Sequence, residues 1–245
     1  MATDIEDLTQ TVLINPVVKH LLAMAARAWK KRWIVTFTGP TRQGKTTAVH
    51  YADRNLPFPH RLFECKPTTT HCDLLRCVGL DASERWNTHG RSWMNSSLLR
   101  ERAVERARKE PYLLIVDEAD QLGHKCFEVL RSLWDDARLP ILLVGNEILR
   151  GKIHEHHSRL AWRIRLQFEE KLLREADTRQ TLEFMGLEVD DTQFNFLWKL
   201  VGGNPGFMQA LLETGREIAE SHGAPLSVDS LAGAVRYFPT LKGVI

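Results

Sequence analysis

A glycine-rich segment at residues 39–47 has the residue types and spacing needed to bind phosphate. It consists of Gly39, Pro40, Thr41, Arg42, Gln43, Gly44, Lys45, Thr46 and Thr47. This order matches the pattern G-x-x-x-x-G-K-[ST], whose glycines let backbone N–H groups approach a polyphosphate. Lys45 supplies a cation for the outer phosphates, and Thr46 offers a hydroxyl ligand to Mg²⁺. We therefore expect this segment to bind a nucleoside triphosphate together with a metal ion.

An acidic pair, Asp117 and Glu118, follows a second apolar run. A carboxylate that follows a buried strand beside a phosphate loop can hold Mg²⁺ directly or through water, and we assign this role to Asp117. We expect Glu118 to orient and polarise an attacking water. The alternative is a solvated acidic turn. The complete phosphate loop upstream argues against this alternative, and a glutamate at 118, instead of a neutral residue, favours a hydrolase.

Three further side chains follow or precede apolar runs. Asn146 comes directly after such a run, where its amide could hydrogen-bond the γ-phosphate or the lytic water, although Gly-Asn also favours an ordinary turn. Arg159 and Arg163 come just before another run, where an arginine could stabilise transition-state charge in a neighbouring subunit. The spacing leaves open which arginine does so, and a surface salt bridge is the alternative for each.

The elements that must position these residues are predicted strands that alternate with predicted helices. Apolar, β-branched runs predict strands at residues 33–38, 61–65, 112–116, 140–144 and 164–168. Helical patterns occur at residues 17–32, 46–53, 73–78, 96–109 and 125–136. Strands that alternate with helices predict an α/β fold in which a five-stranded parallel sheet is covered on both faces.

The pattern changes after residue 169, where no strand signal remains. Helical patterns occur at residues 172–185, 191–201, 207–222 and 228–237. We therefore predict an N-terminal helical segment at 1–32, a nucleotide-binding core at 33–169 and a small all-helical domain at 170–245.

Composition limits the class of protein. Hydrophobic residues make up 43% and charged residues 26% of the chain, which is typical of globular proteins in water. There is no apolar run long enough to span a membrane, and the acidic N-terminus does not resemble a signal peptide, so we expect a cytoplasmic protein. The four cysteines lack zinc-binding spacing and are expected to be free. A net charge of +2 neither demands nor excludes nucleic acid.

The order of phosphate loop, acidic strand end, asparagine-ended strand, arginine pair and helical domain resembles the AAA+ ATPase family over nearly the whole chain. Within that family the sequence looks most like the phage Mu B and TnsC-type transposition regulators. This closer likeness is carried by residues 115–123, 142–146, 158–164 and 204–211. The resemblance implies ATP and Mg²⁺ as cofactors and a homo-oligomer, either ring or helical filament, with ATP at the subunit interface. It also implies assembly on duplex DNA without sequence preference, recruitment of a transposase and possibly of a target-selector protein, and disassembly on hydrolysis.

The sequence departs from the family pattern in two places. Many AAA+ lids carry an arginine that contacts the γ-phosphate, and this chain has Gly206 at that position. The stretch before the first strand is also too short for the N-terminal helix-turn-helix domain of the Mu B protein. We therefore expect any DNA contact to come from the core.

Two loops are candidates for that contact. Lys66 follows the second strand, and Arg91 precedes the helix at 96–109. In DNA-encircling AAA+ assemblies, loops at these two places line the central channel. The alternatives are a solvated lysine and a helix cap or salt bridge. The arginines of helix 96–109 alternate with glutamates, which indicates a salt-bridged solvent face.

Other functions remain open at this level. A protein-directed ATPase, such as an ExeA-like secretion or assembly factor, would carry the same core motifs, as would a helicase loader or a replication-initiation ATPase. His154, His156 and His157 form a weak metal-binding pattern on what we expect to be a polar loop, and we assign them no metal.

Overall fold

The computed structural model describes residues 15–81 and 95–239. Arg91 lies outside these residues. The chain divides into two compact units, and each unit is made of segments that are not consecutive in the sequence. Within the described residues, the first unit contains 17–39 and 45–170. The second contains 40–44 and the residues from Lys171 onward, with residues 15 and 16.

A five-stranded parallel sheet forms the centre of the first unit, as expected. Its strands are β1 (Ile34–Thr38), β2 (His60–Glu64), β3 (Leu113–Asp117), β4 (Ile141–Gly145) and β5 (Ile164–Glu169). They lie in the order β2-β3-β4-β1-β5, and all neighbours pair in parallel. The three inner strands are buried along their whole length, which explains their continuous apolar sequence. The fold class predicted from the sequence is therefore confirmed.

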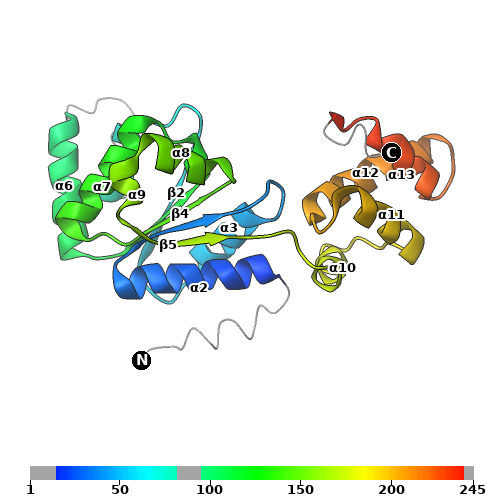
Figure 1. The fold of residues 1–245 in the computed structure, drawn as a ribbon, viewed down its shortest axis with the longest axis horizontal. Coiled ribbons are helices and arrows are strands. Elements are labelled where there is room, and N and C mark those ends of the chain that lie inside the picture. The colour runs from blue at the N-terminus through cyan, green and yellow to red at the C-terminus, as the bar shows by residue number, and fades with distance from the viewer. Residues whose placement is uncertain (1–14, 82–94, 240–245) are drawn as a thin grey trace. The chain divides into compact units, whose positions relative to one another are not determined.

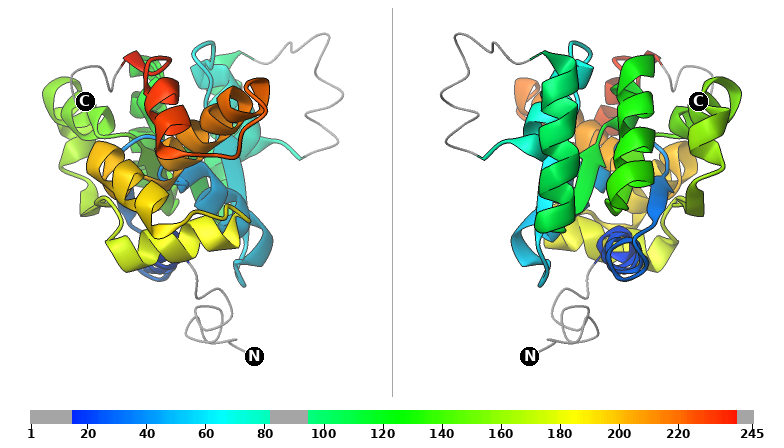
Figure 2. Two further views of the ribbon diagram at one scale, coloured as in Figure 1. Left: turned by 90° about the vertical axis from the view of Figure 1, so that its right-hand side faces the viewer. Right: turned by 90° about the vertical axis from the view of Figure 1, so that its left-hand side faces the viewer.

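Helices cover both faces of this sheet. Two of them, α2 (Pro16–Lys31) and α3 (Lys45–Asn55), lie on one face (Figure 1). The other face is covered by α4 (His71–Gly79), α6 (Ser96–Lys109), α7 (His124–Ala137), α8 (Ile148–His156) and α9 (Ser158–Ala161). Helices α6 and α7 run side by side (Figure 2). Phe127 of α7 is fully buried in the core that these helices share with the sheet.

The segment between β4 and β5 is helical, and our expectation of a polar loop there was wrong. His154 and His156 lie on α8, and His157 joins α8 to α9. His157 is buried, with its ring centroid 4.4 Å from that of Phe127. The helical pattern was hard to see because the buried apolar residues of α8 and α9 are few: Leu149, Ile153 and Leu160.

The second unit contains four helices among its described residues: α10 (Glu175–Phe184), α11 (Asp191–Val201), α12 (Pro205–Ser221) and α13 (Val228–Val235). Side chains of Asp190, Asn204 and Ser227 cap α11, α12 and α13 by accepting hydrogen bonds from first-turn N–H groups. Phe194, Leu211 and Leu231 pack in one apolar core. We call the helical part of this unit, from Lys171 onward, the lid. No helix in the described part of the chain combines the length and hydropathy needed to cross a bilayer.

Candidate nucleotide-binding site

The carboxyl ends of the sheet strands place several predicted residues at one edge. Thr38, which precedes the phosphate loop, pairs with Gly145 in the β1–β4 ladder. Asp117 pairs with Glu64 at the end of the β2–β3 ladder. In parallel α/β sheets, ligands bind at this carboxyl edge. The fold therefore gathers the ends of β1, β3 and β4 where the sequence predicts phosphate chemistry.

Lys45 begins α3 and faces this edge. Its Nζ donates a 2.9 Å hydrogen bond to the Gly39 carbonyl. Burial lowers the pKa of Lys45, and four nearby carboxylates oppose this effect. They belong to Glu118, Asp120, Asp117 and Glu147. The ammonium therefore lies in a partly buried, acidic environment, where a phosphate would be attracted to it and repelled by the carboxylates unless a metal ion neutralised them.

Asp117 is buried and already hydrogen-bonded. Burial raises the pKa of its carboxyl, while hydrogen bonds from the Glu118 N–H and the Thr46 hydroxyl oppose the rise. A hydroxyl and a carboxylate side by side are hard oxygen donors of the kind Mg²⁺ prefers. Mg²⁺ usually takes one or two protein ligands and completes its shell with water and phosphate oxygens, so Thr46 and Asp117 fit such an ion.

Glu118 has an unusual backbone conformation. Its φ is 51°, in the left-handed region, and its side chain is exposed at the strand end. A non-glycine residue in this region is strained by about 1 kcal/mol, and such outliers gather at functional sites. Partial burial of its carboxyl, Asp120 and Asp117 all raise the pKa of Glu118, and Lys45 opposes the rise. These features suit a carboxylate that accepts a proton from water.

Asp120 holds Asn146 in place, and the sequence reading missed this role. The Asp120 carboxylate accepts hydrogen bonds from the Asn146 backbone N–H (3.0 Å) and side-chain Nδ2 (2.9 Å). The Asn146 Oδ1 accepts from the Ile148 N–H at 2.9 Å. Gly145 makes room for this contact, because a Cβ there would lie 2.7 Å from Asp120 Oδ1. The available signal was a further acid, Asp120, three residues after Asp117 at the end of β3.

The structure separates the two arginines that precede β5. Arg163 Nε donates to Asp135 Oδ1 at 2.5 Å, and its guanidinium also donates to the Arg159 carbonyl. The Arg163 hydrogen bond is the largest cause of the lowered pKa of Asp135. Arg159 is exposed, and its side chain has no ion-pair or hydrogen-bond partner within the described residues. Arg159 is therefore the arginine that is available to another molecule.

Lys66 lies in a turn directly after β2. Its backbone N–H donates to Thr69 Oγ1 at 2.7 Å, and its carbonyl accepts from the Thr69 N–H at 2.8 Å. The side chain is exposed, and no partner for its ammonium occurs in the described part of the chain. The turn therefore presents a lysine at the same carboxyl edge as Asp117. The other candidate DNA contact, Arg91, lies outside the described residues.

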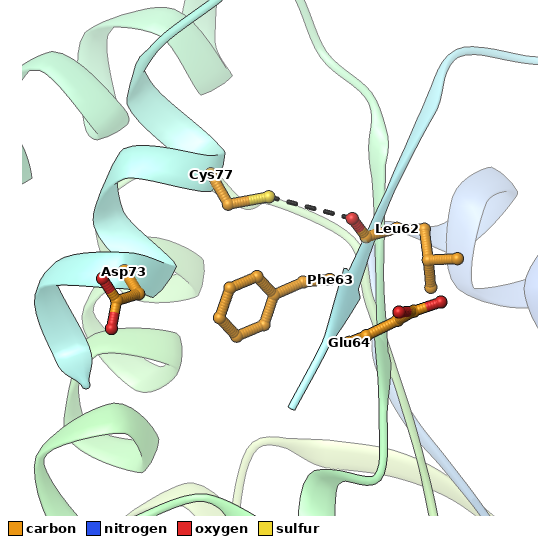
Figure 3. Close-up of a pocket in the computed structure, with 5 residues that line it drawn as sticks. All are labelled: Leu62, Phe63, Glu64, Asp73 and Cys77. Carbon is orange, nitrogen blue, oxygen red and sulfur yellow. Dashed lines mark hydrogen bonds between the residues drawn. The ribbon is translucent and has the colours of Figure 1, made fainter. Parts of the chain in front are cut away.

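A separate pocket of about 390 Å³ lies between β2 and α4 (Figure 3). Phe63 points from β2 toward α4, and Leu62 and Glu64 point to the other face of the strand (Figure 3). Cys77 Sγ donates a weak, 3.9 Å hydrogen bond to the Leu62 carbonyl. The charged residues that line the pocket, Glu64 and Asp73, are both acidic. This pocket is therefore unsuited to phosphate, in contrast to the loop at 39–47.

Helix α6 carries paired charges. Arg100 pairs with Asp136, Arg106 with Asp81 and Glu110, and Lys109 with Glu105. Arg108 donates to the Asp136 carbonyl. The expected salt-bridged face is thus present in the described residues, and these cations are less available to a nucleic acid than Lys66.

The tip of the phosphate loop belongs to the same unit as the lid. Pro40–Gly44 group with the lid residues, while Gly39 and Lys45 belong to the first unit. Arg42 has a φ of 62°, and Gly44 has a φ of 86°. Glycine adopts this region freely, whereas arginine does so only under strain.

Comparison with known proteins gives the family. A model described as an AAA domain matches residues 28–153, just over half of the chain. The chain belongs to the AAA domain family. With its phosphate loop and acidic strand end, it is an ATPase of the AAA class, and the resemblance predicted from the sequence is confirmed.

One curated relative matches part of the chain. It is the Mu-like prophage FluMu DNA transposition protein B of Haemophilus influenzae, 32% identical over 109 residues. The match covers 42% of this chain and 34% of the relative, so the chain aligns with about a third of that protein. Over the matched segment, this supports the expected likeness to Mu B-type proteins.

Solved structures share the fold at low identity. The ORC2 protein of Aeropyrum pernix in its ADP form has a TM-score of 0.59 at 15% identity, covering 90% of this chain and 67% of the other. The RuvB Holliday junction branch migration motor of Thermotoga maritima has a TM-score of 0.57 at 18% identity, covering 90% and 68%. The Aeropyrum pernix ORC1 protein in complex with DNA has a TM-score of 0.60 at 17% identity, covering 90% and 64%. These similarities concern the fold alone.

Proposed function

We propose that this protein is a Mg²⁺-dependent ATPase that assembles on duplex DNA when ATP is bound, recruits or activates a transposase there, and disassembles on hydrolysis. The observation that carries the proposal is the similarity to the Haemophilus transposition protein B. The site geometry supports the nucleotide-dependent part, and such a protein would act in the cytoplasm. We propose residues 33–169 as the ATPase core, 170–245 as the lid and 1–32 as an N-terminal segment.

The chain's own residues divide the work of hydrolysis. Lys45 and the loop N–H groups would bind the β- and γ-phosphates, and Thr46 and Asp117 would hold Mg²⁺, which neutralises charge on the phosphates. Glu118 would accept a proton from the attacking water. Asn146, oriented by Asp120, would hydrogen-bond the γ-phosphate or that water.

A neighbouring copy would complete the site. Arg159 is exposed and unpaired in the described chain, whereas Arg163 is already engaged by Asp135. We propose Arg159 as the arginine that reaches a neighbour's ATP. Trp162, three residues further on, has 83% of its surface exposed, and exposed tryptophans frequently anchor protein interfaces.

DNA would be held through its backbone. Lys66 offers an exposed ammonium, which can neutralise a phosphate without reading bases. Arg91 is the second proposed contact. Binding should therefore be insensitive to base sequence and should weaken steeply as salt rises.

Anisotropy of labelled duplex DNA, with Mg²⁺ and a slowly hydrolysed ATP analogue over a salt series, tests the proposal. We expect binding only with the analogue, and weaker binding at every DNA sequence for Lys66→Ala. Absence of binding under every nucleotide would remove the DNA part and favour the protein-directed ATPase.

The trans arginine has its own test within the same proposal. Arg159→Ala should reduce ATPase activity by about 10³-fold or more. Mixing it with Lys45→Ala should restore activity, because each variant supplies the half-site that the other lacks. Arg163→Ala is the matched control and should mainly destabilise the fold, by about 1–2 kcal/mol, through loss of the Asp135 pair. If mixing restores nothing, Arg159 does not act in a neighbour's site.

A further inference from the structure

The tip of the phosphate loop is held by hydrogen bonds between uncharged groups of the loop and of the lid. Asn204 Nδ2 donates to the Thr41 carbonyl at 2.9 Å, and the Gly206 N–H donates to the Arg42 carbonyl at 3.1 Å. Gln43 Nε2 donates to the Lys171 carbonyl at 2.7 Å. All these residues lie within the lid unit. Three successive loop residues thus bond to the lid, two of them to the start of α12 and the third to Lys171.

Only glycine fits at position 206, because the loop backbone occupies the space beside it. A Cβ on Gly206 would lie 2.3 Å from the Arg42 carbonyl oxygen and 3.1 Å from the carbonyl carbon, far inside contact distance. The obstacle is loop backbone, which cannot move aside as a flexible side chain can. An arginine at this lid position is therefore sterically incompatible with the observed loop, and the family departure seen in the sequence has a structural cause.

The next lid residue contacts the loop side chain. The Arg42 guanidinium lies over the Phe207 ring, 5.0 Å from its centroid. This contact compensates in part for the strained φ of 62° at Arg42. The start of α12 contains Asn204, Gly206 and Phe207, so one helix end makes most of these contacts with the loop.

The loop tip also contains an unsatisfied group. Gln43 is fully buried, and its Oε1 has no hydrogen-bond partner among the described residues. Leaving a buried acceptor unpaired is costly, and such a site favours rearrangement when a better arrangement becomes available.

We propose that Asn204 and Gly206 are positioning residues for nucleotide binding, and that the lid acts on the phosphates by setting the backbone of Thr41–Gln43 instead of through an arginine of its own. Residues 40–44 are joined covalently to Gly39 and Lys45, so lid residues that hold the tip also constrain the N–H groups that meet the phosphates. The inference rests on nucleotide binding at this loop.

Asn204→Ser tests the proposal with little other disturbance. Asn204 Oδ1 caps α12 by accepting from the Phe207 N–H at 3.2 Å, and serine caps helices equally well. Serine is too short to reach the Thr41 carbonyl, so only the loop bond is lost. Asn95→Ser is the matched control, because Asn95 caps α6 by the same contact and lies in the first unit.

We expect Asn204→Ser to raise KM and the Kd of a fluorescent ATP analogue by about three- to tenfold, with a smaller change in kcat. Its unfolding midpoint without nucleotide should fall slightly below that of Asn95→Ser, because the loop hydrogen bond is lost. A purely structural role would produce the same fall and leave the Kd of the folded protein unchanged, and this result would overturn the proposal.

Gly206→Ala gives a second, larger perturbation. Its control is Gly233→Ala in the same unit, where a new Cβ would meet Ile218 at an ordinary 3.5 Å. Nucleotide affinity should fall for Gly206→Ala and stay unchanged for Gly233→Ala. Normal affinity in both variants would argue against the proposal. Lys45→Ala separates the two hypotheses: if it binds nucleotide normally, the site itself is wrongly assigned.

Discussion

The sheet edge and the tip of the phosphate loop are held by different forces. At the edge, the contacts involve charged groups: Asp120 accepts two hydrogen bonds from Asn146, and Glu118 lies near the carboxylates of Asp120 and Asp117. At the tip, neutral amides from Asn204 and Gly206 donate to loop carbonyls. Charged groups can move protons and stabilise developing charge, whereas neutral donors mainly fix geometry. The edge should therefore control turnover, and the tip should control affinity.

Among changes at the edge and the tip, the largest effect is expected from Glu118→Gln. Removing the proton acceptor should reduce kcat by about 10²–10⁴-fold. Nucleotide affinity and assembly on DNA should remain, because glutamine keeps the shape of the side chain. Single-turnover hydrolysis and equilibrium binding, measured on the same preparation, check both parts. Normal turnover in this variant would contradict the division between edge and tip.

A smaller effect is expected from Asp120→Asn. This change replaces one carboxylate oxygen with an NH₂ group. Two donors would then face each other at the Asn146 side chain, so Asn146 would lose its orientation. We expect kcat to fall by about tenfold and stability by about 1–3 kcal/mol, while the Kd for ATP changes little. Asp229→Asn, at an exposed position in the first turn of α13, is the control. A change in the Kd for ATP without a change in kcat would show that Asp120 controls affinity, as the loop tip does.

The smallest effect is expected from Arg42→Gly. Glycine relieves a strain of about 1 kcal/mol at the positive φ and gives up a cation–π contact of about 0.5–1 kcal/mol, so the two changes nearly cancel. The Arg42 carbonyl, which Gly206 binds, is retained. Thermal unfolding and nucleotide Kd should stay close to those of the unchanged protein. A large loss of affinity would show that the Arg42 charge acts at the tip as well as its backbone.

Much of the fold was readable from the sequence. The strands β1, β3 and β4 are buried on both faces, so their apolar runs are continuous and give a strong signal. Helices α8 and α9 were missed because few of their residues are buried, which leaves a weak periodicity. The ends of helices α6 and α11 were predicted without error, and other element ends shifted by up to three residues, as for α10, which begins at Glu175 instead of residue 172.

The candidate site was readable only where its residues form a local motif. The phosphate loop and the pair Asp117–Glu118 stand out because each occupies one short segment. Their catalytic roles stay predictions. Asp120 was overlooked because its partner, Asn146, is distant in the chain and the contact exists only after β3 and β4 pair.

The sequence by itself determined the parallel sheet, the phosphate loop and the acidic strand end, because these depend on neighbouring residues and on periodic burial. Tertiary structure decided which arginine is free, which carboxylate orients Asn146, and why the lid has Gly206 in place of an arginine. Each of these depends on atoms brought together from distant parts of the chain. Arg163 is engaged because Asp135 of α7 lies beside it, and Gly206 is needed because the Arg42 carbonyl occupies the space that a side chain would fill.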